Sequence, residues 1–352
     1  MPTIQRQKSF IFSFFDRNCE TWVRLEGAVA GISQRRRLPA FANPTFKRWF
    51  FERAKRNVNS PRVTLWPDTF NNFFLPATAR AAVDVLETAG FHVIVPRESL
   101  CCGRPLYDYG FLNLAKSLLC KVINTLRSEI RAGTPVVGLE PSCVAVFRDE
   151  LFNLYPNDED AIRLSKQTFL LSEFLRQKAP AFQLPKLYRQ AIVHPHCHHS
   201  AVMKLEAEEA VLKSIGLSFE IMKSGCCGMA GSFGFETAKY DVSLACGERV
   251  LLPSVRHASK DTLIIANGFS CREQIEQQTD RHAMHLAEVV HLALKHGTRG
   301  PEANFPEKPY VPATRTMPHW QVATLVGLSA LGAATFLQFN GKRSFVSRRK
   351  RS

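Results

Sequence analysis

The ten cysteines of this 352-residue chain are its side chains best suited to chemistry. They include two adjacent pairs, Cys101-Cys102 and Cys226-Cys227, each followed by glycine. Neighbouring Cα atoms lie about 3.8 Å apart across a trans peptide bond, which is shorter than the usual disulfide span. The N-terminal residues predict no secretory signal, so we expect reduced thiols in a cytosolic compartment. Such thiols are typical of metal ligands or redox groups.

Four of these cysteines fall at predicted strand ends or turns in the second half of the chain: Cys197, Cys226, Cys227 and Cys271. Four thiolates hold a cubane [4Fe-4S] cluster. Gly228 follows the adjacent pair and relieves steric limits, so both sulfurs can face one site. The sequence therefore predicts a [4Fe-4S] cluster bound by these four residues.

An incomplete copy of this arrangement lies earlier in the chain. Cys101, Cys102 and Cys143 occupy corresponding positions, but Thr69 in WPDT stands where the second half has Cys197 in HPHC. The first site is therefore one thiolate short. We expect it to hold either a weaker cluster or the site of an electron acceptor.

Four histidines, His194, His196, His198 and His199, surround Cys197. Imidazole together with thiolate also suits zinc, so one of these rings could bind a metal. The alternative is that they hydrogen-bond a cluster sulfur or pack at the strand end. Alternation along a strand would place His194, His196 and His198 on one face, opposite Cys197 and His199.

Other polar and thiol groups have simpler interpretations. Cys19, Cys120 and Cys246 lie outside the motifs, and we interpret them as buried apolar thiols. Arg104 and Arg272 each follow a cysteine turn. They either offset the negative charge of a thiolate-bound cluster or lie at the surface as ordinary arginines. The sequence assigns no catalytic residue.

The elements that must position these side chains occur twice along the chain. Each pass is predicted to contain a strand, a helix, a strand leading into CCG, a helix, and a strand before the last cysteine turn. The predicted helices include residues 112–131, 201–216 and 236–252. From the first strand to the CCG turn there are 38 positions in one pass and 34 in the other. From the CCG turn to the last cysteine there are 41 and 44. The two halves therefore share one plan.

Strands that alternate with helices predict an α/β fold. We expect two similar Rossmann-like α/β repeats with mainly parallel sheets, over residues 61–185 and 186–295. In such folds ligands bind at the carboxyl ends of the strands, where the cysteine turns fall. Residues 1–60 show no long periodic segment, and we interpret them as a basic, partly ordered lead-in, most simply a solvated extension.

The formal net charge of +15 is concentrated at the ends of the chain. Residues 1–60 hold 12 Lys/Arg against 4 Asp/Glu, and residues 341–352 hold 6 against none. The residues between carry 28 against 27, so they lack the excess charge for a broad phosphate-binding face. We therefore expect no nucleic-acid partner.

The composition changes after residue 295. Residues 296–318 are Pro-rich and predict a linker, residues 319–340 predict a hydrophobic helix, and residues 341–352 form a basic tail. The helix could anchor the chain in a membrane, lie in the interface, or pack on the protein or a partner. We expect a cytoplasmic protein attached to the cytoplasmic face of a membrane, without committing to a full crossing.

Six ordered motifs between about residues 24 and 295 resemble the CCG or cysteine-rich domain family. They are WPDTFNNFFLP, CCGRPLYDYG, GLEPSC, HPHCHHSAV, SGCCGMAGSFGFE and ANGFSCREQI. The family occurs in heterodisulfide reductase and in iron-sulfur subunits of glycolate oxidase and anaerobic glycerol-3-phosphate dehydrogenase. The motifs are most similar to those in the C-terminal part of FAD-linked D-lactate-type dehydrogenases.

The resemblance implies an iron-sulfur module that passes electrons from a reduced flavin to a quinone or a thiol-disulfide acceptor. It carries cluster ligation onto the seven motif cysteines, Cys101, Cys102, Cys143, Cys197, Cys226, Cys227 and Cys271. The full family motif ends in C-x-x-C, but Glu140 and Gly268 replace the first cysteine of each such pair. An ordinary four-thiolate cluster is therefore expected in place of a five-cysteine one.

The chain carries no flavin-binding domain before residue 60 and no ferredoxin-type cysteine run. We therefore expect FAD on a partner flavoprotein chain, and we do not expect this chain to oxidise a hydroxy acid alone. Two alternatives remain open. One is a zinc-stabilised scaffold that has kept the fold, and the other is a thiol-disulfide oxidoreductase that uses the adjacent cysteines.

Overall fold

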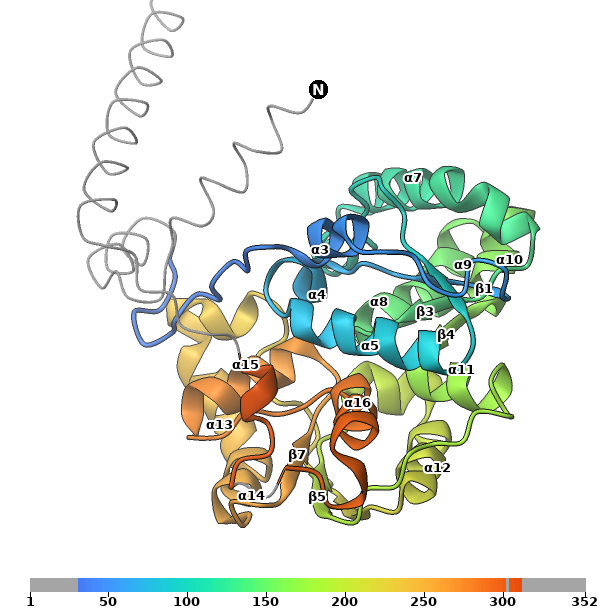
Figure 1. Cartoon of the computed structure of the whole chain (residues 1–352). Helices are drawn as coiled ribbons and strands as arrows, with labels where there is room; N and C mark the ends of the chain where they lie inside the picture. Colours follow the sequence, from blue (N-terminus) through green and yellow to red (C-terminus); the bar gives the residue numbers. More distant parts are fainter. Residues whose placement is uncertain (1–30, 302–303, 312–352) are drawn as a thin grey trace, which may run out of the picture. The chain divides into compact units, whose positions relative to one another are not determined.

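Short apolar runs form the strands of the computed structural model, which describes residues 31–301 and 304–311 (Figure 1). One sheet has the strand order β2-β1-β3-β4 and the other β6-β5-β7. The strands pair in parallel throughout both sheets. Their bounds are β1 (Arg62–Leu65), β2 (His92–Ile94), β3 (Val136–Gly138), β4 (Thr168–Leu170), β5 (Gln190–Val193), β6 (Ser218–Ile221) and β7 (Leu263–Ile265).

Helices connect these strands and cover the sheets. In the first half they are α3 (Phe46–Glu52), α4 (Thr69–Phe73), α5 (Pro76–Thr88), α6 (Arg104–Asp108), α7 (Leu112–Arg131), α8 (Pro141–Ala145), α9 (Leu151–Leu154), α10 (Glu159–Lys166) and α11 (Leu171–Gln177). In the second half they are α12 (Glu206–Ile215), α13 (Tyr240–Glu248), α14 (Leu251–His257), α15 (Phe269–Gln278) and α16 (Leu286–His296). Short π-helical and 3-10 turns complete the chain path, including η2 (His199–Met203) and η3 (Phe233–Phe235).

The two halves have the same sheet topology. β1 lies between β2 and β3, and β5 lies between β6 and β7 in the same arrangement. The prediction of two similar α/β repeats with mainly parallel sheets is therefore confirmed. β4 adds an edge strand to the first sheet that the sequence pattern did not predict.

Helix α7 matches the predicted range because its apolar residues recur every three or four positions and are buried. Two other helices are shorter than predicted. The helix expected over residues 201–216 is interrupted at Lys204, whose φ is 67°, and α12 begins only after it. The helix expected over 236–252 divides into α13 and α14. Pro253 lies near the start of α14, where a missing backbone N–H breaks the preceding helical ladder.

A single apolar core serves both repeats. It contains Val63 and Leu65 of β1 together with Ala191 and Val193 of β5. Helix α5 packs against α16 between the sheets (Figure 1). Full burial of one aliphatic side chain contributes about 1.5–3 kcal/mol to the free energy of unfolding. The shared core therefore stabilises the packing of one repeat against the other. Separate apolar clusters cover the other faces and contain the buried motif cysteines.

The described part of residues 1–60 is mostly exposed or half-buried, but a few of its side chains enter the core. Phe46 and Arg36 are only 0% and 1% exposed. Residues 319–340, where the sequence predicts a hydrophobic helix, lie outside the described residues. Within the ranges that the structure covers, every helix is too short or too polar to cross a bilayer.

Candidate metal centre

The four predicted ligands of the second repeat come from the ends of three adjacent strands. Cys197 follows β5, the Cys226-Cys227 pair follows β6, and Cys271 lies in the first turn of α15 after β7. Parallel strands end at the same edge of a sheet, and β5 is the middle strand. The fold therefore delivers all three turns to one place.

The sulfurs of these turns interact pairwise, each with the next one along a row of four. Cys226 interacts with both Cys197 and Cys227, and Cys227 interacts with Cys271. A ring nitrogen of His194 and the sulfurs of Cys227 and Cys271 all lie within 4.8 Å of one another. Cys227 and Cys271 are buried, whereas Cys197 and Cys226 are exposed. The group therefore has an inner half in the core and an outer half at the surface.

Gly228 allows the turn that presents the adjacent pair. Its φ is +90°, and a Cβ atom there would lie 2.1 Å from the carbonyl oxygen of Ser243 in α13. Its backbone N–H points to the sulfur of Cys226 at 3.4 Å. Only glycine fits this close approach without moving the helix, which confirms the role expected for it in the CCG motif.

The crowded thiols have strongly shifted proton affinities. Interaction with Cys197 and Cys227 lowers the pKa of Cys226, while interaction with Cys226 raises the pKa of Cys197 and of Cys227. Interaction with Cys227 lowers the pKa of Cys271. Neighbouring sulfurs cannot all be ionised unless a cation balances them. This donor set fits a metal that binds thiolates and displaces their protons.

The histidines around Cys197 do not follow strand alternation, because β5 ends at Val193. His194 and His196 are both buried. The Nδ1 atom of His194 lies 2.7 Å from the Ser224 hydroxyl, and its Nε2 atom has no hydrogen-bond partner among the described residues. His194 is therefore placed to interact with a sulfur or a bound metal. Ring nitrogens of His196 and His198 and the sulfur of Cys197 form a second such group within 4.8 Å of one another.

His196 fills the space beside Gly268, the position where the full family motif has a cysteine. A Cβ atom on Gly268 would lie 2.2 Å from Cδ2 of His196. The Nδ1 atom of His196 accepts a hydrogen bond from the backbone N–H of His198 at 3.2 Å. The ring thus occupies the volume that a fifth cysteine side chain would need, which agrees with a four-thiolate site.

The first repeat brings its three cysteines together in the same way. The sulfurs of Cys102 and Cys143 are 3.0 Å apart, and Cys101 interacts with Cys102 and with the hydroxyl of Thr69. Thr69 therefore takes the place that Cys197 has in the second repeat. Asp68 precedes it where the second repeat has His196, and burial raises its pKa to about 6.

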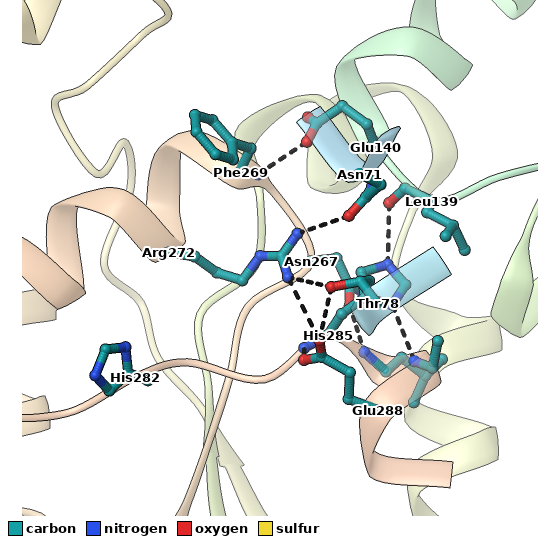
Figure 2. Close-up of polar contacts among 12 residues, drawn as sticks. Asn71, Thr78, Leu139, Glu140, Asn267, Phe269, Arg272, His282, His285 and Glu288 are labelled. Carbon is teal, nitrogen blue, oxygen red and sulfur yellow. Dashed lines mark hydrogen bonds and ion pairs between the residues drawn. The ribbon is translucent and has the colours of Figure 1, made fainter. Parts of the chain in front are cut away.

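Glu140 has a function that its sequence position did not reveal. It follows β3, yet its Oε2 atom accepts a hydrogen bond of 2.8 Å from the backbone N–H of Phe269 in the second repeat (Figure 2). Its Oε1 atom accepts from the Ser142 hydroxyl at 2.8 Å and lies 3.9 Å from Nε2 of His196. The position without a cysteine in repeat one thus supports the thiol turn of repeat two.

Arg272 also joins the repeats and is not a surface residue. Its Nη1 atom donates to Thr78 at 2.9 Å, its Nη2 atom donates to Asn71 at 3.3 Å, and Glu288 lies 4.0 Å away (Figure 2). Arg104 forms ion pairs with Asp108 and Glu150. Both arginines are therefore engaged by protein groups.

The remaining cysteines differ in exposure. Cys120 is exposed on α7, so its interpretation as a buried thiol is wrong, and Cys246 is half-buried in α13. Cys19 lies outside the described residues. Among the described residues, Cys120 is therefore a suitable control for the motif thiols.

Three relatives show what the chain is similar to. It is 26% identical over 277 residues to a component of the anaerobic glycerol-3-phosphate dehydrogenase of Escherichia coli, and these residues cover 77% of this chain and 69% of that protein. It is 28% identical over 242 residues to lactate utilization protein A of Bacillus subtilis, covering 65% of this chain and 98% of that one. A D-2-hydroxyglutarate dehydrogenase of Pseudomonas putida is 28% identical over 230 residues, which are 65% of this chain and 22% of that protein.

The family match falls on the two halves that the topology had already separated. Residues 68–148 and 191–276 each match the cysteine-rich domain that carries the CCG signature. Residues 68–148 contain one set of motif cysteines and the ends of β2 and β3, and residues 191–276 contain the other set and the ends of β5, β6 and β7. Each half of the chain therefore carries a match to the cysteine-rich domain of the CCG family.

Proposed function

We propose that this protein is an iron-sulfur electron-transfer component of an FAD-linked 2-hydroxyacid dehydrogenase of the lactate or glycolate type. Pairwise interactions that link four thiols from three turns at one sheet edge carry the proposal. The relatives support it, because they include a dehydrogenase component, a dehydrogenase and a lactate utilization protein. Two of their names refer to 2-hydroxy acids, lactate and 2-hydroxyglutarate, and the proposed substrate class follows these two, whereas glycerol 3-phosphate belongs to another class.

Cys197, Cys226, Cys227 and Cys271 would hold a [4Fe-4S] cluster, which takes up and releases one electron at a time. The absence of a side chain at Gly268 and the ring of His196 beside it favour four thiolates over five. The two buried sulfurs would shield the iron from water, and the two exposed ones would form the rim nearest to a redox partner. Repeat one would hold a weaker cluster or an acceptor site.

The partners follow from the same assignment. The hydroxy acid would give two electrons and two protons to FAD on a partner flavoprotein, and the electrons would pass through this chain to a quinone or similar acceptor. Residues 319–340 would attach the protein to the cytoplasmic face of a membrane. This chain by itself would then show no dehydrogenase activity.

Metal analysis of the full chain, purified without oxygen, tests the proposal. We expect about four iron and four sulfide per cluster, broad visible absorbance, and a paramagnetic signal after reduction with dithionite. Cys271→Ser removes a buried ligand of repeat two and should abolish the signal of the cluster in that repeat. Cys120→Ser, an exposed cysteine outside the motifs, is the matched control and should keep it.

Two experimental results would favour a different function for this protein. Stoichiometric zinc without iron would favour a zinc-stabilised scaffold, for which His194, Cys227 and Cys271 offer ligands within 4.8 Å. A metal-free chain that oxidises reversibly at Cys102 and Cys143, whose sulfurs are 3.0 Å apart, would favour a thiol-disulfide oxidoreductase.

A further inference from the structure

A short segment before the first repeat is attached to the chain that follows the CCG turn of the second repeat. Ile32 forms an antiparallel bridge with Glu236, and the backbone N–H of Ser33 donates to the carbonyl of Phe235 at 2.6 Å. Glu236 and Phe235 follow the CCG turn of repeat two. The segment lies outside both stretches that match the family, so the family motif does not account for it.

Arg36 of this segment is buried without an ion pair among the described residues. Only 1% of it is exposed. Its Nε atom donates to the carbonyl of Gly234 at 2.9 Å, and its Nη2 atom donates to the Ser243 hydroxyl at 3.0 Å. The guanidinium lies over the ring of Tyr240, 4.9 Å from the centroid, and Nη1 has no hydrogen-bond partner in the part of the chain that the structure describes. A buried arginine held by neutral groups needs a negative charge nearby.

The sulfurs of the thiol turn lie near Arg36 and would supply negative charge there once a bound metal has displaced their protons. Ser243 accepts a hydrogen bond from Arg36 with its hydroxyl, while its carbonyl oxygen lies against Gly228 of the CCG turn, where it leaves no room for a Cβ atom. The charge of Arg36 interacts with the thiol of Cys227 on the same turn. The buried carboxylate of Glu273 in α15 also interacts with this charge. Arg36 therefore lies in the field of the CCG turn as well as in that of the carboxylate.

We propose that Arg36 is the buried positive charge that balances the thiolates of the metal centre. The proposal rests on the function proposed above, because it needs iron held by the four sulfurs. Four thiolates leave such a cluster with a net negative charge, and reduction adds another electron. A fixed cation nearby stabilises the reduced form more than the oxidised form. Arg36 therefore raises the reduction potential of the cluster. It acts as a positioning residue, because it reaches the CCG turn through Ser243 of α13 and does not bind the iron itself.

Redox titration of the iron-loaded full chain, read by its paramagnetic signal, tests this assignment. In Arg36→Met the reduced form should become about tenfold less favoured, which corresponds to about 59 mV for a one-electron couple. Arg36→Lys keeps the charge and should stay within about threefold of the wild-type protein. Arg35→Met is the control, since Arg35 is exposed and pairs with Asp241 at the surface. Its titration should match the wild type.

The outcomes distinguish an effect of the positive charge of Arg36 from an effect of misfolding. An iron-loaded Arg36→Met protein with the wild-type potential would overturn the proposal. If Arg36→Met does not fold, Arg36→Lys decides: a wild-type potential supports the charge assignment, and loss of iron in this variant as well overturns it. A wild-type chain without any iron-sulfur signal would instead refute the proposed function, so the two failures are distinguishable.

Discussion

Glu140 in the first repeat accepts a hydrogen bond of 2.8 Å from the backbone N–H of Phe269 in the second. Phe269 begins α15, and its N–H is one of the groups that the start of a helix leaves without an internal partner. Cys271 lies in the same turn. One carboxylate therefore holds a ligand-bearing turn in place across the boundary between repeats.

Removal of this carboxylate should loosen the thiol turn. Glu140→Ala leaves the buried N–H of Phe269 and the Ser142 hydroxyl without their acceptor, and a lost bond to a charged group costs about 1.5–3 kcal/mol. We expect a fall in the free energy of unfolding of about 2 kcal/mol in urea titrations, together with faster loss of iron to a chelator.

Two variants serve as controls for Glu140. Glu140→Gln keeps one acceptor oxygen and should lose less stability than Glu140→Ala. Glu159→Ala removes a carboxylate whose side chain is 82% exposed, and should change stability by less than about 0.5 kcal/mol. Equal unfolding curves for Glu140→Ala and Glu159→Ala would show that the bond to Phe269 does not stabilise the turn.

Gly268 and His196 should be energetically coupled. Gly268→Ala forces the His196 ring to move, because the added Cβ would lie 2.2 Å from its Cδ2 atom. Overpacking of this kind costs about 1–3 kcal/mol. In the double variant Gly268→Ala with His196→Ala, the clash is gone, so the loss of stability should be smaller than the sum of the single losses. Additive losses would contradict the contact.

Thr69→Cys should complete the first site. The hydroxyl of Thr69 interacts with Cys101 as Cys197 interacts with Cys226, so a thiol at this position supplies the missing fourth ligand. We expect the variant to bind more iron per chain than the wild type, or to retain it longer against a chelator. Thr69→Ser, which adds no thiol, is the control. An unchanged iron content in Thr69→Cys would show that Asp68 or the shape of the pocket prevents cluster binding.

Glu208 should make stability depend on pH. Burial raises its pKa to about 7, against 4.5 for a free glutamate, although Asn267 donates to it at 2.6 Å. Its protonated form therefore stabilises the fold below pH 4.5, and this contribution is lost as the pH rises through about 7. The shift corresponds to about 3 kcal/mol.

Urea unfolding of the wild type and Glu208→Gln at pH 5.5 and pH 8 measures this contribution. The wild type should lose more stability than the variant over that interval. Burial lowers the pKa of the neighbouring His199 to about 4, so this ring is neutral in both folded proteins over the interval and cancels in the difference. Glu206→Gln, in an exposed part of the same helix, is the control. Identical slopes for Glu208→Gln and the wild type would contradict the assignment.

The sequence by itself determined the repeat plan and the sheet edge that carries the thiols. Apolar runs at strand spacing, helices with a regular apolar face and glycine after each cysteine pair are local signals, and each acts within a few residues. Because parallel strands end at one edge, cysteines at strand ends meet there without any further information. Thr69 could also be recognised as the missing ligand by alignment of the two halves.

Only the tertiary structure decided what surrounds the thiols. Arg36 lies 207 positions before Ser243 and Glu140 lies 129 positions before Phe269, and no periodic pattern relates residues so far apart. The location of His196 in the space beside Gly268 likewise depends on how β5 and β7 pair. Charge balance, helix capping and side-chain volume are properties of contacts between distant segments, so they arise only when the repeats pack together.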